Sequence, residues 1–199
     1  MVKAVFFDFG GVIAEEGWEN GLRDIAVKHG FEPEKFFADA CDVLWSTGYM
    51  YGRATEDDFW KGFAERYQFS MTDDEMRGVI FTRFAIRPDV IRLIEKIGKA
   101  GYRLAILSDQ TNWLDQLNER HGFFVLFEKV YNSYHLGKGK KDITVFKEVC
   151  DDFGVEQENA LFVDDNAGHI ERAAKSGMQT LHFSSPSANI KELEQMLDI

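Results

Sequence analysis

The apolar residues of this chain follow two different patterns, which change at about residue 87. The chain opens with a short run rich in Val and Phe, over residues 2–7, which is too short for a typical buried helix. Such a run predicts a central strand of a parallel sheet. From Trp18 to about Ile86 the apolar residues recur at helical spacing instead. We therefore expect an all-helical block inserted after the first strand.

Capping signals divide this block into separate helices. The first helix carries apolar residues at helical spacing and should end at Gly30. Thr55 followed by Asp58, and Thr72 followed by Glu75, are typical of capping boxes that open two later helices.

After Pro88 the pattern alternates between amphipathic helices and short apolar strands. We expect strands over residues 102–107, 129–132, 160–163 and 178–183. We expect helices from residue 90 to a stop at Gly101 and over 112–121, 144–153, 169–176 and 192–197. This alternation is typical of βαβ units with right-handed crossovers. The predicted fold class is α/β, a doubly wound parallel sheet. Residues 1–14 and 87–199 should form its core domain, and residues 15–86 a small inserted helical cap.

Polar residues stand where several of these strands end. Asp8 follows the first strand and is followed closely by Gly10 and Gly11; Ser108 ends the second, and the pair Asp164 and Asp165 ends a later one. A cluster of three lysines, Lys138, Lys140 and Lys141, lies in the loop after the third strand. The carboxyl ends of parallel strands lie at one edge of the sheet, where ligands bind. These groups therefore predict a site for a hard cation and a phosphate.

The amino-acid composition argues against some classes of binding partner. Lys and Arg number 23 against 34 Asp and Glu, so the net charge of −11 argues against nucleic acid or an anionic membrane surface as a partner. No apolar stretch is long enough to span a membrane. Cys41 and Cys150 offer neither a disulfide framework nor metal-ligand spacing, which fits a cytoplasmic location.

Together these motifs resemble those of the haloacid dehalogenase superfamily, in its phosphatase-like branch with a small helical cap. The resemblance spans essentially the whole chain. Its four signatures are matched by Asp8 in Phe-Asp-Phe-Gly-Gly-Val, Ser108 in Ile-Leu-Ser, Lys140 in the lysine-rich loop, and Asp164-Asp165. Each motif alone is weak, but four in this order at strand ends are specific.

The resemblance implies a role for each residue. Asp8 would attack phosphorus and form an aspartyl-phosphate, and Lys140 would neutralise charge on Asp8 and the phosphoryl group. Mg²⁺ would be the cofactor, held by Asp8, the carbonyl of Gly10 and Asp165, with Asp164 behind them. Ser108, the amides near Gly10 and Gly11, and the amide of Asp109 would bind the phosphate.

Two departures from the family pattern concern proton transfer and phosphate binding. Family phosphatases usually carry a second aspartate two residues after the nucleophile, where this chain has Gly10. Without that acid, substrates with good leaving groups such as sugar 1-phosphates or acyl phosphates are favoured. Glu15 and Glu16 could supply a carboxyl group, although exposed acids at a hinge are the simpler interpretation. Asp109 stands where asparagine is common, and a carboxylate beside a phosphate is unfavourable unless it points away.

Two functions follow from these observations. The first is a Mg²⁺-dependent phosphohydrolase acting on a small phosphorylated metabolite, with the cap closing over the substrate and Arg53 or Tyr49 facing it. The second is a weakly active or inactive member that binds a phosphorylated ligand or a protein partner. A dehalogenase is less favoured, because Asp164-Asp165 would then have no evident purpose. The chain would be a monomer or weak homodimer. Of the five histidines, His135 is expected to lie nearest the site.

Overall fold

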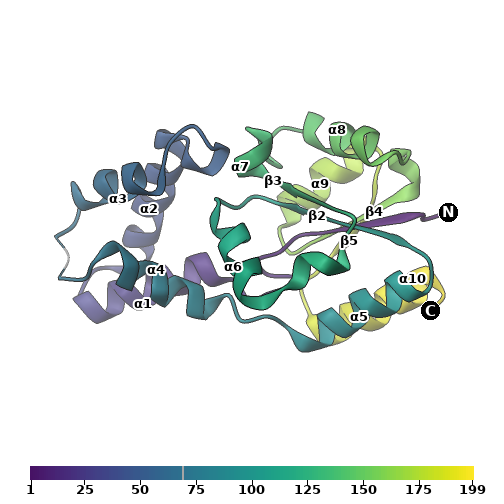
Figure 1. Ribbon diagram of the computed structural model, residues 1–199, viewed down its shortest axis with the longest axis horizontal. Helices are drawn as coiled ribbons and strands as arrows, with labels where there is room; N and C mark the ends of the chain where they lie inside the picture. The colour runs from purple at the N-terminus through teal and green to yellow at the C-terminus, as the bar shows by residue number, and fades with distance from the viewer. Residues whose placement is uncertain (69) are drawn as a thin grey trace.

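A computed structural model of the chain describes residues 1–68 and 70–199, and its centre is a five-stranded parallel sheet (Figure 1). The strand order is β3-β2-β1-β4-β5. The strands are β1 (Ala4–Phe7), β2 (Arg103–Ser108), β3 (Lys129–Asn132), β4 (Ala160–Asp164) and β5 (Gln179–His182). Because the chain extends the sheet to opposite sides of β1, the sheet has a topological switch point there, where ligands bind in such folds. The predicted α/β class is confirmed.

Alternate residues of each strand pack into two separate cores. Val5 and Phe7 of β1 belong to one cluster, and Ala4 and Phe6 to the other, as the two-residue period of a strand requires. The first cluster includes residues of α5 (Pro88–Lys99), α6 (Trp113–His121) and α10 (Pro186–Leu197). The second includes residues of α8 (Thr144–Phe153) and α9 (Ala167–Ser176). Helices therefore cover both faces, and the sheet is doubly wound.

Residues 17–68 and 70–83 form a helical block, which lies at one end of the molecule (Figure 1). It contains α1 (Gly17–His29), α2 (Pro33–Thr47), the short 3₁₀ helix η1 (Tyr49–Tyr51), α3 (Glu56–Ala64) and α4 (Asp73–Arg83). Gly30 ends α1 with φ of 74°, and both predicted capping boxes are present.

The two connections between block and sheet run side by side. The amide of Glu15 donates to the Ala85 carbonyl at 2.9 Å, and the amide of Arg87 donates to the Ile13 carbonyl at 2.9 Å. The division at 14/15 and 86/87 stays a prediction, but these bonds place both crossings at one point.

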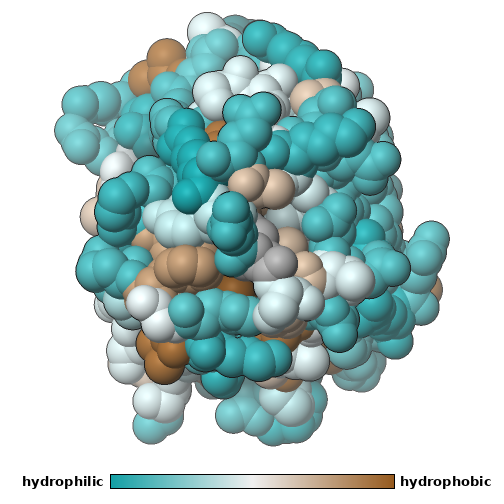
Figure 2. Space-filling view, turned by 90° about the vertical axis from the view of Figure 1, so that its left-hand side faces the viewer, coloured by the Kyte–Doolittle hydropathy of each residue, from teal (hydrophilic) through white to brown (hydrophobic). Residues whose placement is uncertain are grey.

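Seen from the end that carries the helical block, the surface is mainly hydrophilic, with small hydrophobic patches between the hydrophilic residues (Figure 2). Over the part of the chain that the structure describes, no helix has the length and apolar character needed to span a membrane.

Two of the differences from the sequence prediction concern the last helix and the segment after β3. The last helix, α10, begins at Pro186 and not at residue 192, since proline at the first helical position is a start signal. A one-turn helix, α7 (Ser133–Leu136), follows β3 directly and was not predicted. It brings the segment after β3 against the helical block, where the Ser133 hydroxyl donates to the Met50 carbonyl at 3.1 Å.

Candidate active site

Asp8 lies at the carboxyl end of the central strand. Its amide donates to the Val163 carbonyl of β4 at 2.9 Å, so the sheet ladder holds its backbone. One carboxylate oxygen, Oδ1, accepts a hydrogen bond from the Phe9 amide at 2.7 Å. The side chain is only 10% exposed. Asp8 is therefore a fixed, nearly buried carboxylate with one oxygen, Oδ2, turned toward other side chains.

Lys140 supplies the cation that faces it. Its ammonium Nζ lies 2.7 Å from Asp8 Oδ2 and 2.7 Å from Asp164 Oδ2, and its side chain is fully buried. The structure selects Lys140 from the lysine cluster, because Lys138 pairs with Glu148 at the surface and Lys141 lies over the Trp45 ring. A buried charge is tolerated only when it is paired in this way.

These three groups shift one another's protonation. Burial, and to a smaller extent Asp164, raises the pKa of Asp8 well above its usual range, although Lys140 opposes the shift. Burial alone would lower the pKa of Lys140, but Asp164 and Asp8 outweigh it and raise that pKa. Burial alone would raise the pKa of Asp164, but Lys140 and His169 outweigh burial and lower that pKa. Two carboxylates thus share one ammonium and leave an excess negative charge.

His169 is a functional candidate that the sequence prediction missed. Its ring Nδ1 lies 3.2 Å from Asp164 Oδ2, in the first turn of α9. Asp164 Oδ1 also accepts from the Asn166 amide at 2.7 Å. The available signal was its position five residues after Asp164, at the start of the helix that follows β4.

Ser108 and Asp109 lie beside Asp8 as expected. Ser108 is buried, and its hydroxyl acts on the Asp8 carboxylate in the direction that lowers the pKa of Asp8. The Asp109 carboxylate accepts from the Lys140 amide at 2.9 Å, so it is bound to the lysine loop. This contact explains how a carboxylate can follow Ser108 beside an anion site, since its charge is directed at a backbone donor.

The loop after Asp8 is fitted to Asp165. Gly11 has φ of 75°, and the Asp165 carboxylate fills the space that a Cβ at position 11 would need, with Oδ2 only 2.0 Å from it. Burial, and then Asp164, raises the pKa of Asp165. Gly10, without a side chain, lies between Asp8 and this contact. The loop thus brings a third carboxylate to the same sheet edge.

The residues present fit a divalent cation. Ligand atoms of Asp8, Asp164 and His169 all lie within 4.8 Å of one another, and Asp165 adds a further carboxylate nearby. One ammonium cannot balance these acids. Oxygen-rich, excess-negative donor sets are the ones that Mg²⁺ prefers.

A cavity of about 100 Å³ opens onto Asp8. Ser108, Asp109 and Gly10 line it from the core, and Trp18, Leu44 and Met50 line it from the helical block. Glu16 also lines it. Glu15 and Glu16 were both expected to be exposed acids, but only Glu15 is exposed, where its carboxylate pairs with Arg87 at 2.9 Å. Glu16 is half-buried and turned toward Gly10, and burial, with a smaller contribution from Asp165, raises its pKa to about 7.

Three predicted participants are elsewhere. The Arg53 guanidinium donates to the Gly137 carbonyl at 3.3 Å and does not line the Asp8 cavity, because it lies over the Tyr51 ring at the surface. The Tyr49 hydroxyl is bonded to Asn112, so it joins the block to the core. His135 pairs with Asp115 at 2.7 Å and is exposed, so His169, not His135, contacts the acid cluster.

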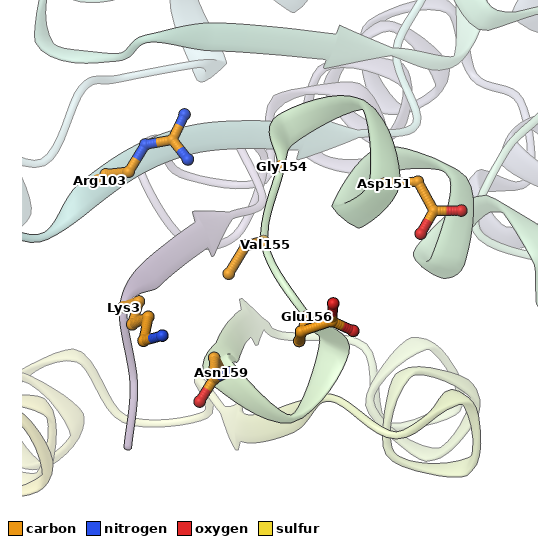
Figure 3. A pocket seen from close by; sticks show the side chains of 7 residues that line it. All are labelled: Lys3, Arg103, Asp151, Gly154, Val155, Glu156 and Asn159. Carbon is orange, nitrogen blue, oxygen red and sulfur yellow. The ribbon is translucent and has the colours of Figure 1, made fainter.

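A second hollow, of about 350 Å³, lies at the opposite edge of the sheet (Figure 3). It is lined by Lys3 before β1, Arg103 at the start of β2, and Glu156 and Asn159 before β4. In Figure 3 these side chains surround an open space and come from just before β1, from β2 and from the one segment that precedes β4. Ligands of open parallel sheets bind at the carboxyl ends of the strands, so this amino-end hollow is not the candidate site.

Solved structures with the same fold include magnesium and phosphate complexes. A predicted haloacid dehalogenase-like hydrolase from Porphyromonas gingivalis is 22% identical, with a TM-score of 0.79 over 100% of this chain and 99% of that one. A family enzyme from Bacteroides thetaiotaomicron, crystallised with magnesium and inorganic phosphate, is 21% identical, with a TM-score of 0.72 over 91% and 93% of the two chains.

Two curated relatives are fungal. The drimenol cyclase drtB of Aspergillus calidoustus is 26% identical over 70% of this chain and 27% of its own length. The sesquiterpene phosphatase astK of Aspergillus oryzae is 26% identical over 58% of this chain and 61% of its own length. The chain thus spans about a quarter and three-fifths of these two relatives.

The family model for haloacid dehalogenase-like hydrolases matches residues 2–177, which include the sheet edge with Asp8, Ser108, Lys140 and Asp164. This chain belongs to the haloacid dehalogenase-like hydrolase family.

Proposed function

We propose that this protein is a Mg²⁺-dependent phosphohydrolase that forms an aspartyl-phosphate on Asp8. The observation that carries the proposal is the buried Lys140 ammonium, 2.7 Å from both Asp8 and Asp164. Burying one cation between two carboxylates at a strand end is energetically costly, and such costly charge clusters are typical of functional sites. Lys140 would favour the ionised form of Asp8, against the burial that raises its pKa, and would offset the charge of an incoming phosphate.

The other residues of the edge complete the proposed mechanism. Asp8, the Gly10 carbonyl and Asp165 would hold Mg²⁺, with Asp164 anchoring Lys140 behind them. When bound, the ion would offset charge on the phosphoryl oxygens. Ser108 and the amides of the Gly10–Gly11 turn and of Asp109 would donate hydrogen bonds to those oxygens.

The cavity favours a monophosphate with an uncharged, partly apolar leaving group. Trp18, Leu44 and Met50 form its outer wall. Among the described residues that line this cavity there is no Lys or Arg to pair with a second anionic group. The sesquiterpene phosphatase relative supports such a substrate, and sugar 1-phosphates remain the polar alternative.

The helical block would act as a cap. The cavity of about 100 Å³ is smaller than ordinary ligand pockets of roughly 300–1,000 Å³. A substrate of terpenoid or sugar size would therefore enter only if the block moved about its paired connections at Ala14 and Ile86, and closure would then exclude water.

Hydrolysis of 4-nitrophenyl phosphate, a sugar 1-phosphate and a prenyl monophosphate, each with Mg²⁺ and with excess chelator, tests the proposal. We expect Mg²⁺-dependent turnover that Asp8→Asn lowers by at least about 10³-fold, since a nucleophile has no substitute. Phosphate binding without turnover of any substrate would favour the binding-protein alternative, for which the bare Gly10 is the motivating observation.

A further inference from the structure

The reaction proposed above leaves one task unassigned among the groups around Asp8. The oxygen that leaves phosphorus needs a proton, and the water that cleaves an aspartyl-phosphate needs a base. Besides Asp8 and the indole of Trp18, which does not ionise, five residues with a polar side chain line the cavity: Glu16, Ser108, Asp109, Gln110 and Thr111. Among the described residues that line the cavity beside Asp8, these five are the candidates for a proton donor and acceptor.

Four of these five residues are unsuited to the task. The Asp109 carboxylate accepts from the Lys140 amide through both oxygens, at 2.9 and 3.2 Å. Ser108 carries a hydroxyl, which is a weak acid, and it acts on the Asp8 carboxylate. Gln110 has no ionisable group, and the Thr111 hydroxyl accepts from the Trp113 amide at 3.3 Å and is a weak acid.

Glu16 is the remaining acid, and its position is specific. Its Oε1 accepts from the Glu19 amide at 3.3 Å, which fixes the carboxylate at the start of α1. Its other oxygen, Oε2, lies 3.0 Å from the point that a Cβ of residue 10 would occupy. A carboxylate therefore reaches the neighbourhood of Gly10 from a residue six positions further along the chain.

Helix capping alone does not account for this glutamate. The residues that cap helices well are Ser, Thr, Asp and Asn, whose short side chains reach the first-turn amides. Glu16 uses only one oxygen for the cap and directs the other into the cavity beside Asp8. The absence of a side chain at Gly10 leaves the room for it.

We propose, building on the phosphohydrolase function above, that Glu16 is the general acid and base of the reaction. Asp8 Oδ attacks phosphorus while the bond from phosphorus to the leaving oxygen breaks, and protonated Glu16 gives its proton to that oxygen. The Glu16 carboxylate then takes a proton from water, whose oxygen attacks phosphorus. The bond to Asp8 breaks, which releases phosphate and restores the Asp8 carboxylate and protonated Glu16.

Glu16→Gln tests this role, because glutamine keeps the size and the capping oxygen but cannot transfer the proton. With 4-nitrophenyl phosphate the leaving group needs no proton, so the variant should release about one equivalent of nitrophenol in a burst. Steady turnover should then fall by ~10²–10⁴-fold as water attack slows. Glu15→Gln, at the neighbouring exposed acid, should leave both phases unchanged.

Moving the carboxylate provides a second test that does not depend on one variant. Gly10 lacks a positive φ, so aspartate is tolerated there once Glu16 is shortened. We expect Gly10→Asp combined with Glu16→Ala to recover steady turnover relative to Glu16→Ala alone.

The outcomes separate the two proposals. Burst and steady rate falling in parallel, together with no recovery in the double variant, would show that Glu16 is only a helix cap. A steady rate in Glu16→Gln equal to that of the unchanged protein would overturn its role while leaving Asp8 chemistry intact. No Asp8-dependent hydrolysis by the unchanged protein would overturn both proposals.

Discussion

Both edges of the central sheet collect charged side chains, but they hold them differently. At the carboxyl edge Lys140 is fully buried between Asp8 and Asp164. At the amino edge Arg103 is 41% exposed and pairs with Glu128, itself 48% exposed. The two edges belong to the same strands, so their difference does not come from the sheet itself.

The charges at the amino edge are exposed to solvent, whereas those at the carboxyl edge are buried, which costs folding free energy. Exposed ion pairs contribute little stability, whereas buried ones are costly unless every charge is matched. The carboxyl edge has more acids than cations, which fits a site completed by a metal ion and an anion. The hollow at the amino edge, of about 350 Å³, is larger than the cavity at Asp8, but the described charged side chains that line it form no buried cluster.

Removing the buried ammonium should give the largest effect. Lys140→Met leaves Asp8 and Asp164 without a cation, so we expect the free energy of unfolding to fall by about 3–5 kcal/mol and activity to be lost. Urea denaturation and phosphate release measure the two effects.

Lys138→Met, two residues earlier on the same loop, is the matched control. Its ammonium pairs with Glu148 at the surface, so the loss should stay below about 1 kcal/mol. Equal losses in the two variants would contradict the claim that the edges differ.

Gly11→Ala and Gly154→Ala compare the edges at the level of the backbone. Both glycines have nearly the same conformation, with φ of 75° and 73°, so each alanine should cost about 1–2 kcal/mol in strain. A Cβ at position 11 also meets Asp165, whereas no described atom lies within 4 Å of one at Gly154.

We therefore expect only Gly11→Ala to weaken Mg²⁺-dependent activity beyond its effect on stability, because it displaces Asp165. Titration of the rate with Mg²⁺ distinguishes the variants. If Gly11→Ala needed no more Mg²⁺ than the unchanged protein, or if Gly154→Ala needed as much more as Gly11→Ala, the claim that Asp165 takes part in the site would be wrong.

Arg103→Ala should give the smallest effect. Its guanidinium donates to the Phe153 carbonyl at 2.9 Å and stacks on the Phe153 ring, 4.0 Å from the centroid. We expect a loss of about 1 kcal/mol in stability and an unchanged turnover rate. A large loss of turnover would show that the amino edge takes part in function.

The fold was largely predictable because its signals are local. The strand pattern, the capping boxes at Thr55 and Thr72 and the glycine at the end of α1 each depend on a few neighbouring residues. The parallel sheet then follows from the alternation of strands and helices. The one-turn helix after β3 has no such pattern, since four residues are too few to show a period.

The site was predictable only in part. Asp8, Ser108 and Asp164 could be placed from the sequence because a strand end fixes a side chain's position. Sequence spacing could not show that Lys140 points inward, because loop geometry decides the direction of each lysine. Glu16 was expected to be exposed, and the structure instead places its side chain at the start of α1 and beside Gly10.

The most direct test of the account is chemical trapping of the intermediate on Asp8. Borohydride added during turnover reduces an aspartyl-phosphate to homoserine, which peptide mass spectrometry locates. The account predicts homoserine at position 8, with more of it in Glu16→Gln and none in Asp8→Asn. Steady phosphate release without homoserine at position 8, in a protein whose Asp8→Asn variant is still active, would contradict it.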